Sequence, residues 1–155
     1  MSTDERTVLE QLDKLVLESD LSFEIRRSKE LLKHDPSLLA GTVPVSLNKF
    51  KGSLPAEIGS ARIFSLRANT QFKTERHPNS RQRVISLEGT GVIVVKDKAL
   101  PRTLTLTSSP HALLEERWAS VAPNVWHQPQ ANDQDWVVLT FHQVPENELI
   151  DQYLD

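Results

Sequence analysis

Glutamate and histidine are residue types that commonly bind divalent metal ions, and three such residues are candidates for a metal site in this chain. Glu75 and His77 lie two residues apart in a β-rich segment, so on a strand both project from one face, about 7 Å apart. A second imidazole, His127, follows fifty residues later. A carboxylate with imidazoles suits Fe, Mn, Ni, Zn or Co. Two strands that meet in a barrel would unite these side chains; otherwise they are unrelated surface residues.

Three further residues are candidates for the surroundings of such a site. Gln82 begins the next β-rich run, and Lys73 shares a strand face with Glu75. Lys73 would hold an anionic group of a substrate, or extend to the mouth of the barrel. If one face of the run 136–142 points inward, His142 enters the barrel as a third imidazole or a proton-transfer group. The alternative for His142 is a hydrogen-bonded residue at a strand end.

The elements that must position these residues are short strands. Eight β-rich runs are separated by turn residues after about residue 42, with no helical segment between them. The runs are 43–47, 61–67, 70–77, 82–88, 91–96, 102–107, 117–121 and 135–142. This spacing predicts an antiparallel sandwich or barrel.

Two helices are expected before the strands. Residues 3–18 have apolar side chains at helical intervals, and Ser2 and Glu5 have the spacing of a capping box. A second helix is expected from Ser22 to about Lys33. A helical hairpin of this length cannot bury its own apolar stripe, so it must pack on the barrel or on a second subunit.

Two segments of the chain resemble the two signature motifs of the cupin family. The segment ERHPNSRQRVISLEGTG resembles the first motif, G-x5-H-x-H-x3–4-E-x6-G. Glu75 stands at the first histidine position and His77 at the second. Gln82 takes the position of the glutamate, and Gly89 follows at the required distance.

The segment VAPNVWHQPQAN resembles the second motif, G-x5-P-x-G-x2-H-x3-N. His127 matches the histidine, while Ala122 and Asn124 occupy the proline and glycine positions. Asn132 lies one position beyond the motif's asparagine. Two of the four usual cupin ligands are therefore kept, and a carboxylate replaces a third.

The resemblance covers about residues 60–145 and implies a mainly β fold, a cupin-type double-stranded β-helix barrel, or jelly roll, after the N-terminal helical hairpin. The expected parts are the helices over 1–41, the barrel over 42–148 and an acidic tail over 149–155. Cupin-like barrels commonly dimerise, so a homodimer is expected.

For the site, the resemblance implies a divalent ion, Fe, Mn, Ni or Zn, held by Glu75, His77 and His127. Gln82 is then a neutral fourth ligand or a neighbour of the ligands. The function implied is a metal-dependent oxidoreductase of the dioxygenase kind, or an isomerase, acting on a small anionic molecule. The alternative is a non-catalytic or metal-free cupin that binds a small ligand as a sensor or regulatory module.

Composition excludes several other classes of function. The 155 residues include no cysteine, which excludes disulfides, thiolate metal sites and cysteine nucleophiles. With 18 Lys and Arg against 21 Asp and Glu, the net charge of −3 argues against a nucleic-acid partner. No apolar run approaches the ~20 residues that span a bilayer, and the acidic N-terminus does not resemble a secretory signal. A cytoplasmic protein without a membrane partner is expected.

Charge is unevenly distributed along the chain. Residues 61–83 carry six basic side chains and one acidic one, whereas residues 133–155 carry six acidic side chains and no Lys or Arg. The basic stretch therefore faces an acidic segment, frames an anionic ligand, or is a solvated strand face neutralised by the chain's own acidic ends.

Overall fold

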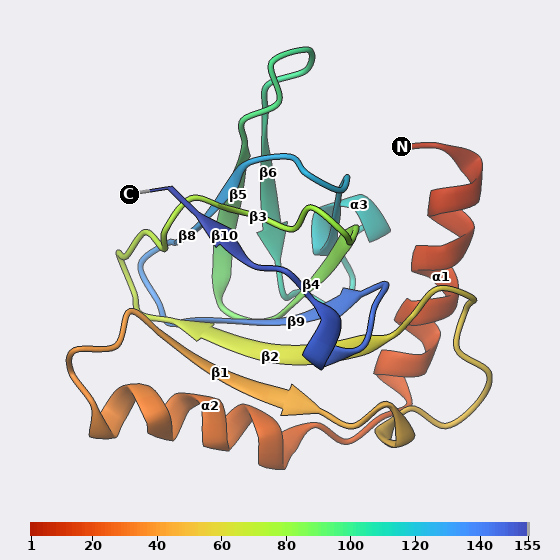
Figure 1. Ribbon diagram of the computed structural model, residues 1–155. Coiled ribbons are helices and arrows are strands. Elements are labelled where there is room, and N and C mark those ends of the chain that lie inside the picture. The colour runs from red at the N-terminus through yellow and green to blue at the C-terminus, as the bar shows by residue number, and fades with distance from the viewer. Residues whose placement is uncertain (155) are drawn as a thin grey trace.

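The computed structural model describes residues 1–154, in which two antiparallel five-stranded sheets form the predicted β-barrel (Figure 1). One sheet has the strand order β1-β2-β9-β4-β7 and the other β10-β3-β8-β5-β6. The strands are β1 (Ala40–Val45), β2 (Ser60–Leu66), β3 (Glu75–Arg76), β4 (Gln82–Glu88), β5 (Thr90–Val95), β6 (Arg102–Thr107), β7 (Trp118–Val121), β8 (His127–Ala131), β9 (Trp136–His142) and β10 (Gln152–Tyr153). The helices are α1 (Thr3–Leu17), α2 (Ser22–His34) and α3 (Leu114–Arg117), with 3-10 turns at Leu47–Lys49 and Glu146–Glu148.

Strand β9 is buried on both faces, which explains why the barrel needs a helical cover. Val137, Leu139 and Phe141 belong to the apolar cluster that α1 completes. Val138 points the other way, into the apolar cluster between the two sheets. His142 is on that same inner face, as the alternation along the run predicts, and it lines the barrel cavity.

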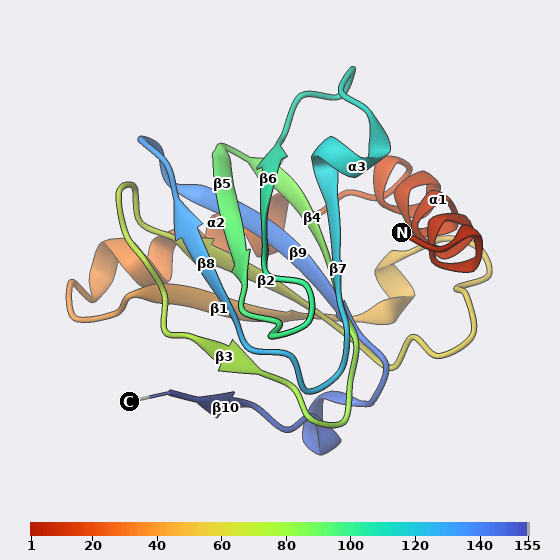
Figure 2. The same ribbon diagram turned by 90° about the horizontal axis from the view of Figure 1, so that it is seen from above.

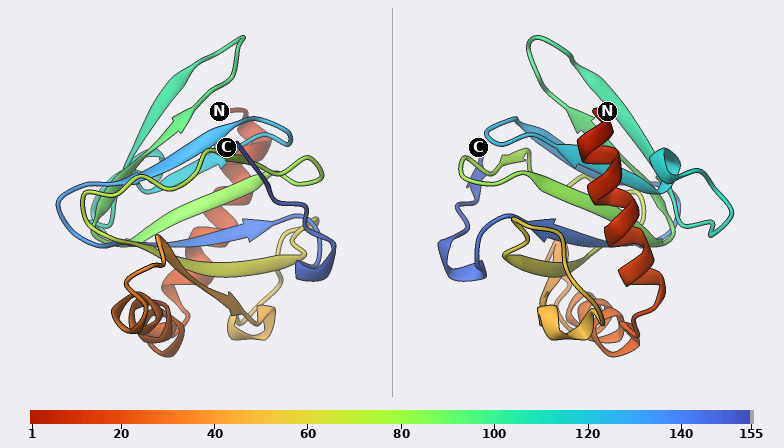
Figure 3. Two further views of the ribbon diagram at one scale, coloured as in Figure 1. Left: turned by 60° about the vertical axis from the view of Figure 1, so that its left-hand side comes forward. Right: turned by 90° about the vertical axis from the view of Figure 1, so that its right-hand side faces the viewer.

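Helix α1 packs on the outside of the barrel formed by its own chain. Ser2 caps it by accepting a hydrogen bond from the backbone N–H of Glu5 at 3.2 Å. Leu9 and Leu12 are completely buried in the same cluster as Leu139 of β9. Figure 3 shows α1 lying across the strands. The apolar stripe of α1 is therefore covered within one chain.

Two carboxylates of α1 pair with basic residues of the barrel. Asp13 accepts hydrogen bonds from Arg117 at 2.6 and 2.9 Å and from Nε1 of Trp118 at 2.8 Å. Glu5 pairs with Arg83 at 2.8 Å. Burial raises the pKa of both carboxyl groups, but the hydrogen bonds from their partners more than offset this and lower it below the ordinary value.

Helix α2 lies along β1 and β2 on the outer side of their sheet (Figure 1). The hydroxyl of Ser28, which is fully buried, donates to the carbonyl of Gly41 at 2.6 Å. Phe23 and Leu31 of this helix are exposed. The expected homodimer stays a prediction, as do the division into 1–41, 42–148 and 149–155 and the cytoplasmic location. No helix within residues 1–154 is long and apolar enough to cross a membrane.

The strand expected over residues 70–77 is mostly absent. Only Glu75 and Arg76 form a strand, and Gln71 makes a single bridge to Gln130. Strands β8 and β10 were not predicted, because one is polar with a proline inside it and the other spans only two residues. These three short strands lie side by side and carry much of the candidate site (Figure 2).

We predict that replacing Asp13 with Asn lowers the free energy of unfolding by about 1–3 kcal/mol at pH 7, because it weakens the charged acceptor of Arg117 and Trp118. The pKa of Asp13 is lower in the folded state than in the unfolded state, where it is about 3.9. The contribution of the ionised Asp13 carboxylate to the free energy of unfolding is therefore complete above about pH 5. It is lost as the pH falls through the lowered pKa. Urea unfolding from pH 7 to pH 3 should show the difference between the two proteins shrinking below about pH 4.

Glu10 of the same helix provides the matched control. Its side chain is 58% exposed and, among residues 1–154, pairs only with Arg6 one turn away, so Glu10→Gln should change the free energy of unfolding by less than about 0.5 kcal/mol. Equal losses in Asp13→Asn and Glu10→Gln would contradict the stabilising role of the Asp13 contacts.

Candidate metal centre

The pairing of β3 with β8 brings the candidate ligands together. Glu75 is directly opposite His127 in this pair, and His77 follows one residue after β3 ends. Oε1 of Glu75 lies 3.4 Å from Nε2 of His127 and 3.9 Å from Nε2 of His77. One ligand atom from each residue can be chosen so that all three lie within 4.8 Å of one another. The structure thus unites the three residues for which the sequence predicted a metal site.

The two imidazoles present nitrogen atoms that the protein leaves without partners. His77 and His127 are 3% and 1% exposed, and within residues 1–154 neither Nε2 atom has a hydrogen-bond partner. Nδ1 of His127 lies 2.9 Å from the carbonyl oxygen of Val125. Because a carbonyl only accepts, Nδ1 carries a hydrogen, and Nε2, the nitrogen nearer Glu75, is the one left for an ion. Buried imidazole nitrogens without partners are suited to a metal ion.

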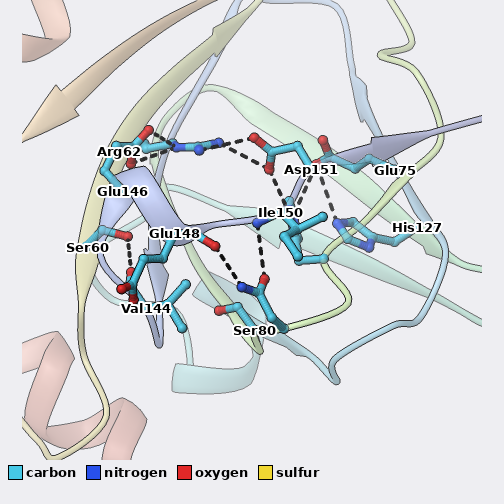
Figure 4. Close-up of polar contacts among 12 residues, drawn as sticks. Ser60, Arg62, Glu75, Ser80, His127, Val144, Glu146, Glu148, Ile150 and Asp151 are labelled. Atoms are coloured by element: carbon cyan, nitrogen blue, oxygen red, sulfur yellow. Dashed lines mark hydrogen bonds and ion pairs between the residues drawn. The ribbon is translucent and has the colours of Figure 1, made fainter.

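A carboxylate that the sequence reasoning missed lies behind His77. Oδ1 of Asp151 is 3.0 Å from Nδ1 of His77, and the other carboxylate oxygen is 3.2 Å from Arg62. Figure 4 shows the guanidinium of Arg62 between the carboxylates of Asp151 and Glu146. Burial raises the pKa of Asp151, but contact with His77 and the charge of Arg62 outweigh burial and lower the pKa to about 2. The sequence feature that pointed to this contact was the charge distribution: Arg62 belongs to the basic stretch 61–83 and Asp151 to the acidic stretch 133–155.

His142 adds a third buried imidazole next to the candidate ligands. Its ring centroid is 4.7 Å from that of His77, and its Nδ1 has no hydrogen-bond partner within residues 1–154. Burial, followed by the neighbouring His77 and Arg62, lowers the pKa of His142 well below its ordinary value. Gln82 is directly opposite His142 in the pairing of β4 with β9. His142 and Gln82 therefore share the inner face of one sheet, where both line the cavity.

A cavity of about 60 Å³ lies between the two sheets beside these residues. Its polar wall includes Glu75, His77, Gln82 and His142, and its apolar wall includes Phe64, Phe72, Val84, Ile93, Trp136 and Val138. Arg62 and Tyr153 also line it. Lys73 is exposed and does not line the cavity; its ammonium group lies 5.5 Å from the centre of the Tyr153 ring.

The loop before His127 depends on an asparagine where the cupin motif has glycine. Asn124 has a φ of 64°, a left-handed conformation that asparagine tolerates better than most residues. Its backbone N–H donates to the carbonyl of His77 at 2.9 Å. This turn therefore joins the segments that carry His77 and His127.

The three residues fit a divalent ion in their chemistry and spacing. Ligand atoms about 2.1 Å from one ion lie about 3 Å apart when adjacent and about 4 Å apart when opposite. The separations of 3.4 and 3.9 Å between Glu75 and the two imidazoles are in this range. Two histidines and one carboxylate with open positions form the donor set of non-haem iron oxygenases.

The comparisons with known proteins rest on structure alone. No family's sequence model matches the chain, and no curated protein matches it in sequence. Oxalate decarboxylase of Lactobacillus farciminis, solved as a formate complex, covers 75% of this chain with a TM-score of 0.58 and 16% identity. Salicylate 1,2-dioxygenase of Pseudoaminobacter salicylatoxidans, solved with gentisate, covers 86% with a TM-score of 0.62 and 17% identity. An oxalate oxidase in complex with glycolate covers 75% with a TM-score of 0.56 and 6% identity.

This chain has the cupin fold, which confirms the fold class that the two motif-like segments implied. The match spans 31% of the length of the oxalate decarboxylase, 36% of the dioxygenase and 57% of the oxalate oxidase. The described residues also contain a candidate metal site of two histidines and a glutamate.

We predict that Asn124→Val lowers the free energy of unfolding by about 1–2 kcal/mol, because a β-branched residue is strained at a φ of 64°. Asn124→Gly is the matched control and should leave stability nearly unchanged, since glycine adopts this conformation without a steric penalty. Chemical denaturation of both variants checks this. Equal stability of the valine and glycine variants would show that the turn does not need the left-handed residue.

Proposed function

We propose that this protein is a metal-dependent cupin enzyme that acts on a small anionic molecule. The observation that carries the proposal is the buried set of Glu75, His77 and His127, whose ligand atoms lie within 4.8 Å of one another. Burying two imidazoles and a carboxylate with unpartnered nitrogens destabilises a fold unless something binds them. A divalent ion provides that partner.

Each residue then has a defined task. Glu75, His77 and His127 hold the ion, and Gln82 stands beside them as a neutral fourth ligand or a hydrogen-bonding neighbour. The ion supplies a Lewis acid that polarises an oxygen of the substrate. His142 is neutral at neutral pH and borders the cavity, so it accepts or returns a proton at the reacting group.

Two observations support a small anionic substrate. The cavity of about 60 Å³ admits only a few non-hydrogen atoms unless the neighbouring side chains move. The structurally similar proteins were solved with formate, gentisate or glycolate, all small carboxylates or carboxylic acids. Lys73 lies outside the cavity over Tyr153, where its charge would attract an anion on approach.

Manganese is one candidate metal, because Mn(II) centres are described for the similar oxalate decarboxylase of Bacillus subtilis.

We predict that untagged protein carries close to one equivalent of a divalent metal and that the double variant His77→Ala/His127→Ala carries none. Elemental mass spectrometry of both proteins measures this directly. The metal should also raise the thermal unfolding temperature of the metal-free wild type, because a ligand at 100 times its Kd adds about 2.7 kcal/mol to the free energy of unfolding.

The variant His34→Ala/His111→Ala removes two exposed histidines and should keep the full metal content. Metal far below one equivalent in wild type, even after supplementation, would contradict the proposal. The second candidate function, a metal-free cupin that binds a small ligand, would then stand; it is favoured by Gln82, a neutral side chain where the motif has glutamate.

We predict that His142→Gln lowers turnover by about 10²–10⁴-fold while its metal content stays at the wild-type level, because the variant loses only a proton-transfer group. Oxygen consumption or product formation with a panel of small carboxylates provides the assay. Loss of metal from His142→Gln would instead make His142 a ligand. Unchanged turnover would remove it from the reaction.

A further inference from the structure

We propose that Asp151 is a positioning residue for the metal centre and that the segment 149–154, here called the C-terminal strap, completes that centre. This inference deepens the proposed function and rests on it. It assigns a structural task to residues that lie outside both motif-like segments.

The strap holds the backbone of the strand that carries Glu75. Strand β10 pairs with β3, so that Tyr153 is opposite Glu75. The N–H of Leu154 donates to the carbonyl of Thr74 at 3.0 Å. On its other side, β3 pairs with β8 only through Glu75 and His127. A two-residue strand has few hydrogen bonds of its own, so the strap provides much of what keeps Glu75 in place.

The strap also reaches the second ligand through a side chain. Oδ1 of Asp151 lies 3.0 Å from Nδ1 of His77, on the side of the ring away from the Nε2 atom that faces Glu75. The contact is at ion-pair distance and does not count as a hydrogen bond. A carboxylate at this nitrogen favours a proton on Nδ1 and leaves the lone pair of Nε2 for an ion. Such partners orient metal-binding histidines in general.

Arg62 holds the carboxylate of Asp151 in place, but pairing with Arg62 does not explain why this carboxylate lies next to His77. Arg62 already pairs with both carboxylate oxygens of Glu146, at 2.8 and 3.0 Å, so its charge is compensated without Asp151. One carboxylate oxygen of Asp151 accepts from this guanidinium at 3.2 Å (Figure 4), and the other lies 3.0 Å from Nδ1 of His77. We therefore assign the contact with His77, rather than charge compensation of Arg62, as the task of Asp151.

The test measures Co(II) binding to the whole metal-free chain at one fixed pH. Calorimetry gives the affinity, and the visible absorption of the bound ion gives a second readout. We expect Asp151→Asn to weaken Co(II) binding by about 10–100-fold and to shift the absorption bands. Asp151→Glu, which keeps the carboxylate, should recover part of the affinity. Glu148→Gln, an acidic residue beside the strap with an exposed side chain, should bind like wild type. His77→Ala should lose the site.

A second measurement needs no variant. The ¹⁵N spectrum of the imidazoles in Zn(II)-loaded wild type should place the metal on Nε2 of His77 and a hydrogen on Nδ1; metal on Nδ1 would overturn the proposal. Wild-type affinity and absorption in Asp151→Asn, together with loss of binding in His77→Ala, would overturn the role of Asp151 and leave the proposed function intact. A wild type that binds neither Co(II) nor Zn(II) would overturn both.

Discussion

The candidate metal centre depends on the backbone pairing of a strand only two residues long. Strand β3 has β8 on one side and β10 on the other, and the pair of Glu75 with His127 is the point where the carboxylate meets an imidazole. A shift by one residue in this pairing would turn Glu75 to the opposite face of the sheet. The register of β3 thus decides whether the chain has a site.

The sheet that faces β3 across the interior is the one whose central strand, β9, is buried on both faces. Helix α1 covers Leu139 and Phe141 on the outer face of β9, which leaves the inner face of the same strand for His142 and the cavity. The polar residues of the candidate centre lie directly beside the apolar cluster between the sheets: Gln82 is opposite Val121 of that cluster, and His127 is opposite Val95. Rigid packing around a small polar region holds side chains in place without many hydrogen bonds between them.

Residue spacing predicted the elements with regular patterns. The alternation along β9 grouped His142 with Val138 on one face without deciding which face points inward, and the two-residue spacing of Glu75 and His77 brought both into one candidate site. The polar strand that begins at His127 has little β-propensity, and its existence depends on neighbours distant in sequence. Asp151 could not be placed either, because its contact with His77 spans more than seventy residues and depends on how the chain returns after β9.

The departures from the cupin motifs balance in charge. The usual set of three histidines and one glutamate contains one carboxylate, and here Gln82 removes that carboxylate while Glu75 restores one at a histidine position. The donor set therefore keeps a single negative charge and loses one imidazole. If substitutions had only removed metal ligands from the site, nothing would require a carboxylate near both remaining histidines. Oε1 of Glu75 nevertheless lies 3.4 Å from Nε2 of His127 and 3.9 Å from Nε2 of His77. The carboxylate and the two imidazoles are all buried in contact with one another, so the three residues are best understood as one unit.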